Sequence, residues 1–104
     1  MNNQLKKGVL ELAIMGLLDQ EELYGYLIVQ RLEPYIKVKE SSVYILLSRL
    51  KQNDYVDERV EMNGKKKINY LRLNAKGKEQ KKLLQKQWNE LEILIAATVK
   101  ENDE

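Results

Sequence analysis

The chain has 104 residues, with 18 Lys and Arg against 16 Asp and Glu, 43% hydrophobic residues, and neither histidine nor cysteine. This length predicts one domain, whose core is small enough that pairing of two copies is expected to help stabilise it. The two missing residue types exclude zinc fingers, histidine-dependent triads and thiol chemistry, so we expect no metal and no cofactor.

The sequence contains no segment that resembles a membrane anchor or a signal peptide. Its longest uncharged apolar run, Leu12–Leu18, is far shorter than the ~20 residues that a membrane-spanning helix needs. Lys6, Lys7 and Glu11 are out of place in the apolar stretch of a signal peptide. We therefore expect a soluble, cytoplasmic protein.

The positive charge is concentrated in one segment. Residues 63–82 carry eight basic side chains and one acidic side chain, although the net charge of the whole chain is only +2. Such a segment is either an ordinary solvated lysine-rich surface or a surface that attracts a polyanion. The choice depends on the elements predicted around it.

Two helices are predicted in the first third of the chain. Residues 5–18 are apolar around most of the helical circumference, which predicts a helix covered on one side by its own domain and on another by a partner subunit. The acidic stretch Asp19–Glu22 predicts a loop. A second, short helix follows over residues 24–32, and it must end near Glu33, because Pro34 disfavours helical geometry in the residue before it.

A third helix is predicted over residues 40–53, after a basic connector that contains Lys39. Ser41 or Ser42 is expected to cap its amino end, and Asn53-Asp54 is expected to end it, since asparagine tolerates left-handed geometry. Helical spacing separates an apolar face from an outward face that carries little charge, as suits a helix that enters a DNA groove. The apolar face holds Val43, Leu46, Leu47 and Leu50, and the outward face holds Ser41, Ile45, Ser48 and Gln52, flanked by Tyr44 and Arg49.

A β-hairpin is predicted next, from residues 55–61 and 67–73. Asn63-Gly64 between these two runs of β-forming residues is typical of a type I′ turn. With that dipeptide at the centre of the turn, Val56 is expected to face Leu71. The tip of the hairpin would then carry Lys65, Lys66 and Lys67.

Asn74 is expected to cap a long final helix over residues 75–100. Gly77 is a modest objection to so early a start, because glycine costs ~1 kcal/mol relative to alanine inside a helix. The apolar residues of this helix are spaced four and three apart, which predicts a seam that contacts another helix. The seam consists of Leu84, Trp88, Leu91, Ile95 and Thr98.

This order of elements predicts a mainly α fold with a small β-hairpin, a winged helix-turn-helix followed by a long helix. Residues 1–74 would form the DNA-binding part and residues 75–104 a carboxy-terminal dimerisation helix, within one compact domain overall. Lysines would contact phosphates, and the third helix would contact base edges. The expected DNA contacts are Lys39, Ser41, Ser42, Tyr44, Ile45, Ser48, Lys65, Lys66 and Lys67.

Five short motifs in this order resemble the PadR-like transcriptional regulators, in particular the short members with a single carboxy-terminal helix. The resemblance covers roughly residues 5–97. It implies a homodimeric repressor whose third helix and wing bind an inverted-repeat operator on double-stranded DNA, and which a small planar aromatic effector releases. The motifs are Gly8–Leu12, Tyr24–Tyr26, Ser42–Tyr44 with Leu47–Leu50, Tyr70–Gly77 and the helix around Trp88.

The resemblance also implies a role for Trp88, which matches a tryptophan that lies at the dimer interface of multidrug-sensing relatives and stacks on drugs. Three positions depart from the family pattern. Ile45 stands where many members have Pro, Asp54 where they usually have Gly, and Asn74 where they usually have Thr. The expected walls of a pocket beside the tryptophan are Leu84, Gln85, Leu91, Glu92 and Ile95, with Leu12 and Met15 of the first helix.

Two alternatives stand beside this interpretation. A winged-helix dimer can serve protein contact alone, for which the apolar first helix and the seam are sufficient, and a DNA-binding dimer can act without a ligand. An enzyme is not expected, because the acidic clusters Asp19–Glu22 and Asp57–Glu61 lack a partner acid, base or metal-binding arrangement, and there is no glycine-rich phosphate loop.

Overall fold

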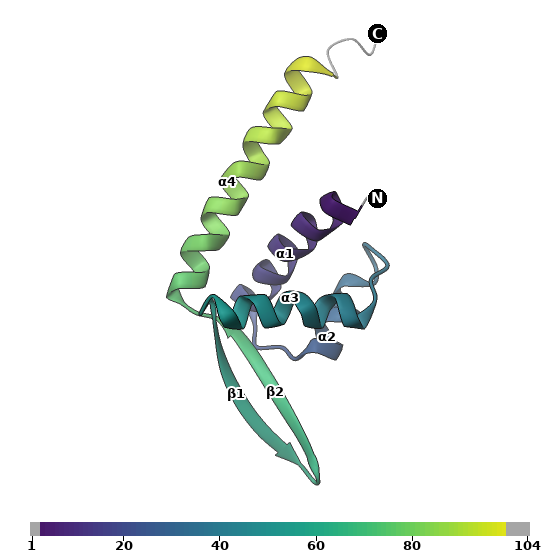
Figure 1. Cartoon of the computed structure of the whole chain (residues 1–104), viewed down its shortest axis with the longest axis vertical. Helices are drawn as coiled ribbons and strands as arrows, with labels where there is room; N and C mark the ends of the chain where they lie inside the picture. Colours follow the sequence, from purple (N-terminus) through teal and green to yellow (C-terminus); the bar gives the residue numbers. More distant parts are fainter. Residues whose placement is uncertain (1–2, 100–104) are drawn as a thin grey trace.

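The computed structural model describes the backbone of residues 3–99 and the side chains of residues 6–99. Three helices and the base of an antiparallel hairpin surround one core, while the outer hairpin and the last helix project from it in opposite directions (Figure 1). The predicted winged helix-turn-helix arrangement is thus confirmed. The elements are α1 (Asn3–Gln20), α2 (Gly25–Leu32), α3 (Glu40–Gln52), β1 (Val56–Asn63), β2 (Lys66–Leu73) and α4 (Ala75–Thr98).

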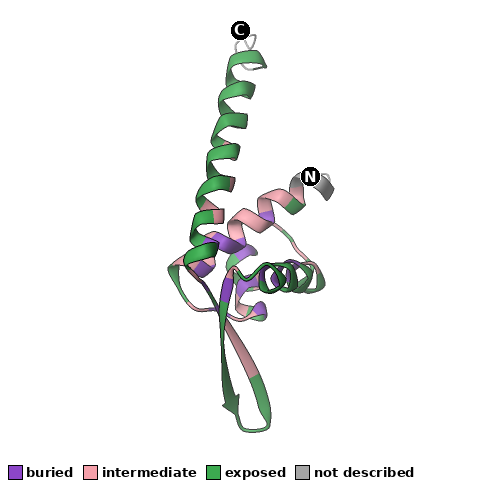
Figure 2. Cartoon of the chain, turned by 60° about the vertical axis from the view of Figure 1, so that its left-hand side comes forward, coloured by how far each residue is buried: buried purple, intermediate pink, exposed green. Residues whose placement is uncertain are grey.

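The core consists of apolar side chains, and within the described residues no polar or charged residue is buried. Figure 2 shows that burial is concentrated where α1, α2 and α3 meet the base of the hairpin, and that the outer hairpin and the distal half of α4 are exposed. The core therefore holds α3 against α1 and α2 and leaves one face of α3 open. The buried residues are Leu10, Ile14, Met15, Leu18, Leu23, Ile28, Leu32, Val43, Leu46, Leu47, Leu50, Val56, Leu71 and Leu73.

Helix α1 extends past the predicted end, because Asp19 belongs to its last turn rather than to a loop. The Nζ of Lys81 in α4 donates a hydrogen bond to Asp19 Oδ2 at 2.6 Å, and the Nζ of Lys78 lies 3.8 Å from Oδ1. This hydrogen bond from Lys81 holds the pKa of the Asp19 carboxyl below its ordinary value. Asp19, one of the acidic residues that predicted a loop, thus connects α1 to α4.

The amino-terminal cap predicted for α3 is wrong, although its inward face is confirmed by the burial of all four predicted apolar residues. The N-cap is Lys39, so Ser41 and Ser42 lie inside the first turn and neither caps the helix. At the other end α3 finishes at Asn53-Asp54 as predicted, with Asn53 as the C-cap and Asp54, rather than the asparagine, in the left-handed conformation with a φ of 60°. Helical periodicity and the Asn53-Asp54 pair therefore predict the buried face and the carboxy end of α3, whereas the N-cap lies two or three residues before the expected serines.

A Schellman motif ends α3. The backbone N–H of Tyr55 donates to the carbonyl oxygen of Leu50, and that of Asp54 donates to the carbonyl oxygen of Lys51, both at 3.0 Å. This motif needs one residue in the left-handed conformation, which glycine adopts most easily. Asp54 occupies the position at which the resemblance leads us to expect glycine, and the backbone there still takes the glycine-like conformation.

The hairpin register differs by two residues from the prediction. Val56 pairs with Leu73 rather than with Leu71. The turn consists of Gly64 and Lys65, and only the glycine has a positive φ, at 67°. That pattern is typical of a type II′ turn, whereas the expected type I′ turn needs a positive φ at both central residues. Because the shift is even, every side chain keeps its predicted face of the hairpin.

Helix α4 starts where the sequence predicts. The Oδ1 of Asn74 accepts a hydrogen bond from the backbone N–H of Gly77 at 2.8 Å, and its Nδ2 donates to the carbonyl oxygen of Asp54 at 2.9 Å. A Cβ added at Gly77 would collide with the carbonyl oxygen of Tyr55 and with the side chain of Leu73. Position 77 thus requires glycine, and this close approach explains why a residue that disfavours helices stands in the first turn of α4.

Candidate nucleic-acid interface

The outward face of α3 is open to solvent along the helix. Ser41 and Ser48 are exposed, Ile45 is 60% exposed, and Ser42 is half-buried at one flank. None of these four side chains carries a charge, so short hydroxyl groups and one aliphatic side chain are presented together. These are groups that can meet base edges and thymine methyl groups in a major groove.

Tyr44 lies on the other flank of this face and packs on α2. A Cβ added at Gly25 would collide with the ring and hydroxyl of Tyr44, so the glycine leaves the space that the ring occupies. The side chain is nevertheless 46% exposed. Burial, and then the neighbouring carboxylate of Glu40, raise the pKa of the Tyr44 hydroxyl above its ordinary value. A tyrosine hydroxyl is protonated at neutral pH even without such a shift, so it can donate a hydrogen bond.

A cleft of about 640 Å³ lies between this flank of α3 and the hairpin. No local pattern in the sequence groups its residues, which come from the start of α2, from α3 and from both strands. Tyr24, just before α2, and Tyr26, in its first turn, both line the cleft, and Tyr26 is exposed. The full lining is Tyr24, Gly25, Tyr26, Tyr44, Asn63, Lys66, Lys67, Ile68 and Asn69.

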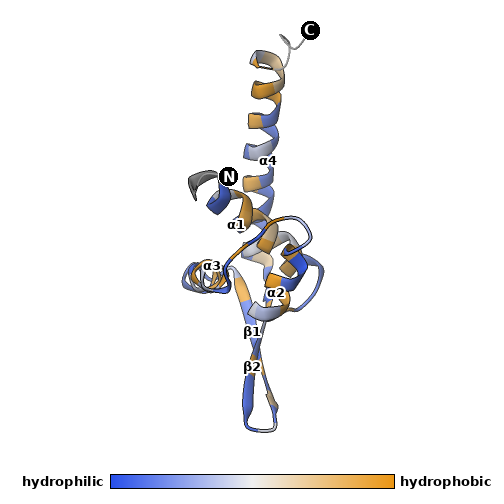
Figure 3. Cartoon of the chain, turned by 90° about the vertical axis from the view of Figure 1, so that its right-hand side faces the viewer, coloured by the Kyte–Doolittle hydropathy of each residue, from blue (hydrophilic) through white to orange (hydrophobic). Residues whose placement is uncertain are grey.

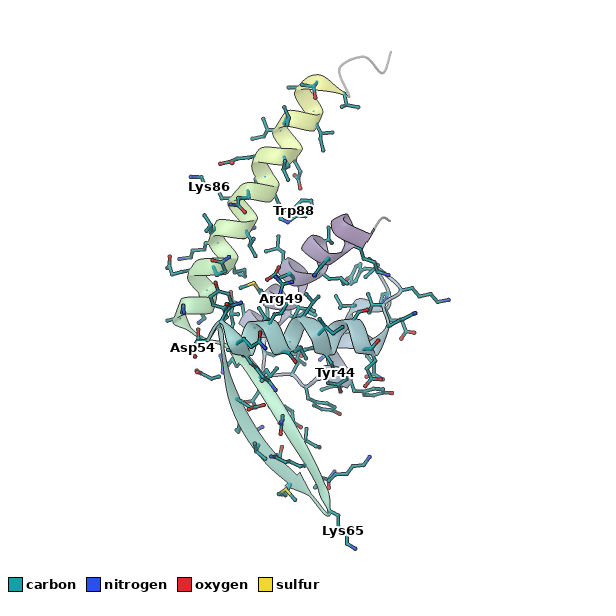
Figure 4. The ribbon with its side chains drawn as sticks, in the orientation of Figure 1. Tyr44, Arg49, Asp54, Lys65, Lys86 and Trp88 are labelled. Atoms are coloured by element: carbon teal, nitrogen blue, oxygen red, sulfur yellow. The ribbon has the colours of Figure 1, made fainter. Side chains whose placement is uncertain are left out.

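The lysines of the hairpin tip are not neutralised. Lys65 stands in the turn and points away from the molecule (Figure 4), and Lys66 and Lys67 begin β2. Within residues 6–99, none of the three forms an ion pair with a carboxylate, whereas Lys78 and Lys81 of α4 both pair with Asp19. The basic segment of the sequence therefore divides into an unpaired tip and a partly paired helix.

The base of the hairpin is fixed to the start of α2. The backbone N–H of Leu23 donates to the carbonyl oxygen of Leu71 at 3.0 Å, and the N–H of Leu71 returns a bond to Leu23 at 2.8 Å. Tyr24 meets Tyr70 edge to face, with ring centroids 5.4 Å apart. These contacts set the angle between the hairpin and the helices.

Trp88 lies against α1 (Figure 4), and a Cβ added at Gly8 would be 3.5 Å from its ring. Of the walls expected around it, Leu12 and Leu84 are half-buried, and Gln85, Leu91, Glu92 and Ile95 are exposed. Met15 is completely buried in the core of its own chain. The expectation that Met15 lines a pocket is therefore wrong, because no surface of it is left for a ligand or a partner subunit.

The model of the PadR-like family of transcriptional regulators matches residues 14–89. The chain belongs to this family. Family membership makes it a transcriptional regulator rather than an enzyme. No curated protein matches the chain.

Solved structures of PadR proteins share its architecture. A PadR-like transcription factor from Bacteroides fragilis is 33% identical, with a TM-score of 0.79 over 90% of this chain and 93% of the other. A PadR regulator from Eggerthella lenta, 24% identical, has the same fold, with a TM-score of 0.87 over 95% and 88% of the two chains. Bacillus subtilis PadR, solved in complex with operator DNA, is 29% identical, with a TM-score of 0.64 over 70% of this chain and 45% of its own.

Among the described residues, no helix is both long and apolar enough to cross a membrane. Within the same residues, no cluster of carboxylates is arranged to hold a metal ion.

Proposed function

We propose that this PadR-like regulator is a cytoplasmic homodimeric repressor that binds an inverted-repeat operator through α3 and the lysine-rich hairpin tip. The observation that carries the proposal is the uncharged open face of α3 beside Lys65, Lys66 and Lys67, which pair with no carboxylate among residues 6–99. Lysine is a point charge without the guanidinium fork of arginine, so the tip is suited to phosphates and α3 to base edges. The operator complex of Bacillus subtilis PadR supports this assignment.

The homodimer is inferred from the apolar surface of α4. Leu91 and Ile95 are each 47% exposed and lie on one side of the helix with Leu94, which is 56% exposed. Figure 3 shows apolar residues recurring along α4 well beyond the point where it leaves the core. A stripe of this kind with heptad spacing is buried most simply by the same stripe of a second copy.

Dimerisation would present two α3 helices to two half-sites of one operator, which is why an inverted repeat is expected. Repression follows if the occupied operator overlaps a promoter. A planar aromatic compound that stacks on Trp88 would sit at this interface and change the spacing of the two α3 helices. That change would lower operator affinity, because both helices must fit the same duplex.

The experiment compares DNA binding by two triple variants, using a fluorescent duplex from the region upstream of the protein's own gene. K65Q/K66Q/K67Q removes the hairpin charges, and K76Q/K82Q/K86Q removes three charges from α4. Each lost phosphate contact weakens binding about tenfold at ~0.1 M salt, so the hairpin variant is expected to lose at least a hundredfold and the α4 control far less. Equal losses in the two variants would contradict the assignment.

The alternative, a winged-helix dimer that serves protein contact alone, predicts a different result. The hairpin variant would then remain dimeric and would show no DNA-binding defect, since wild type itself would not bind the duplex. Sedimentation velocity on both variants shows whether the dimer is intact. Repression itself is tested by a promoter fusion, whose expression is expected to rise when the regulator gene is deleted.

A further inference from the structure

A second lysine-lined cleft lies between the start of α1 and α3. Its volume is about 400 Å³, and Lys6, Lys7 and Lys39 surround a floor to which Leu10 and Leu46 contribute. Ser42 and Ile45 of the open α3 face complete its wall. Lys6 and Lys7 are the only basic residues of α1, and no pattern in the sequence connects them with α3.

This cleft and the hairpin lie on opposite flanks of α3. At 100° per residue, Ser42 and Tyr44 are about half a turn apart, and Tyr44 lines the hairpin-side cleft whereas Ser42 lines this one. Figure 1 shows the same relation, with α1 above α3 and the hairpin below it. The open face that carries Ser48 lies between the two flanks.

The charge of this second cleft is as free as that of the hairpin tip. Within residues 6–99, Lys6, Lys7 and Lys39 form no ion pair with a carboxylate, in contrast to Lys78 and Lys81. Leu10 and Leu46 are each only 3% exposed, so the floor is part of the core. Lysine stems can lie on such a floor while the ammonium groups stay in water.

We propose that Lys6 and Lys7, with Lys39, bind phosphates of the DNA strand that borders α3 on the side away from the hairpin. The proposal rests on the proposed function. The major groove is about 12 Å wide, close to the diameter of a helix with its side chains, so a helix in the groove has a phosphate backbone on each flank. The hairpin lysines would contact the phosphates on one side of the groove, and the lysines of α1 would contact those on the other side. Such contacts fix the orientation of α3 without reading sequence.

The test measures how the binding constant for the upstream duplex depends on salt for K6Q/K7Q and for a control, K82Q/K86Q, that removes two exposed lysines from α4. The slope of log Kobs against log salt is negative, and each lost phosphate contact makes it less steep by about one. Two contacts are lost in each of the two subunits, so the expected slope for K6Q/K7Q is less steep by about four, and the slope for the control is unchanged. K6R/K7R, which keeps both charges, is expected to keep the wild-type slope.

A K6Q/K7Q slope equal to that of the control would overturn the proposal. Thermal unfolding of each variant separates this outcome from misfolding, since a folded K6Q/K7Q protein is required for the comparison. Failure of the underlying function looks different, because wild type would then bind no duplex at any salt concentration. Steep salt dependence that responds to the hairpin lysines alone would leave operator binding intact and refute only the α1 contact.

Discussion

Arg59 in β1 binds the carboxylate of Glu22, just before α2, through three short contacts. Its Nε lies 3.0 Å from both carboxylate oxygens, and its Nη2 lies 2.7 Å from Oε1. The guanidinium also stacks on Tyr70, with Cζ 4.6 Å from the ring centroid. The hydrogen bond from Arg59 lowers the pKa of Glu22, so the pair is intact at neutral pH and is lost only on acidification through that lowered value. The pair connects the hairpin to the helices by side chains 37 residues apart.

Replacing Glu22 by alanine is expected to weaken DNA binding several-fold. Charge alone predicts the reverse, because removing a carboxylate makes the protein more attractive to DNA. If the pair holds the hairpin at the angle that DNA binding needs, loss of the pair outweighs the gain in charge. Fluorescence anisotropy with the upstream duplex measures the change.

The matched control for E22A is D57A in β1. Asp57 is exposed, and among the described residues it forms no ion pair, so its removal changes charge without freeing the hairpin. D57A is expected to bind DNA as well as wild type or more tightly. Tighter binding by E22A as well would show that the pair does not position the hairpin.

Replacing Gly77 by alanine is expected to destabilise the protein by about 1–3 kcal/mol, the usual cost of overpacking. The added methyl group would collide with the Tyr55 carbonyl oxygen and force α4 away from the core. Gly16 of α1 is the control, since a Cβ there meets no atom within 4 Å. G16A is expected to be neutral or stabilising by up to ~1 kcal/mol, and urea unfolding followed by circular dichroism distinguishes the two. A G77A protein as stable as wild type would show that α4 does not need this close approach.

Charges placed on the α4 stripe are expected to convert the dimer into a monomer. L91K/I95K puts two ammonium groups on the surface that two copies would share. Ile93, which is 69% exposed, lies on another side of the helix, so I93K should leave the dimer intact. Sedimentation velocity reports both. If I93K dissociates the dimer and L91K/I95K does not, the dimer interface lies on the Ile93 side of α4, which would contradict the proposed interface.

Trp88 is the only tryptophan, so its fluorescence reports directly on the proposed effector site. Proflavine, a planar aromatic cation, is expected to quench this fluorescence with a saturable profile in the absence of DNA. E92Q should bind the dye more weakly, because Glu92 is the carboxylate expected among the walls of the pocket. Unsaturable quenching identical to that of free tryptophan would argue against an effector site here.

Local patterns in the sequence predicted the elements well but not the contacts that connect them. Period 3.6 identified the buried face of α3, and the capping chemistry of Asn74 located the start of α4. The Asn-Gly dipeptide indicated a hairpin but not its register, because Gly64 alone supplies the positive φ that the turn requires. Local signals thus determine which structure forms more reliably than which residue pairs with which.

The sequence predicted those parts of the candidate interface whose residues lie together on a single helix or hairpin. The outward residues of α3 and the lysines of the hairpin tip follow from periodicity and charge. The place of Tyr44 against Gly25, the Arg59 pair with Glu22 and the approach of Lys6 to α3 depend on tertiary packing between distant segments. Single-sequence patterns carry no information on such distances.

The salt dependence of wild-type binding to the upstream duplex tests the central claim, DNA binding by α3 and the hairpin, most directly. Three hairpin lysines in each of two subunits give a slope of log Kobs against log salt of about −5 or steeper. The account predicts tight binding at ~50 mM salt that falls steeply as salt is raised. No binding at ~50 mM salt, or binding that salt does not weaken, would contradict it.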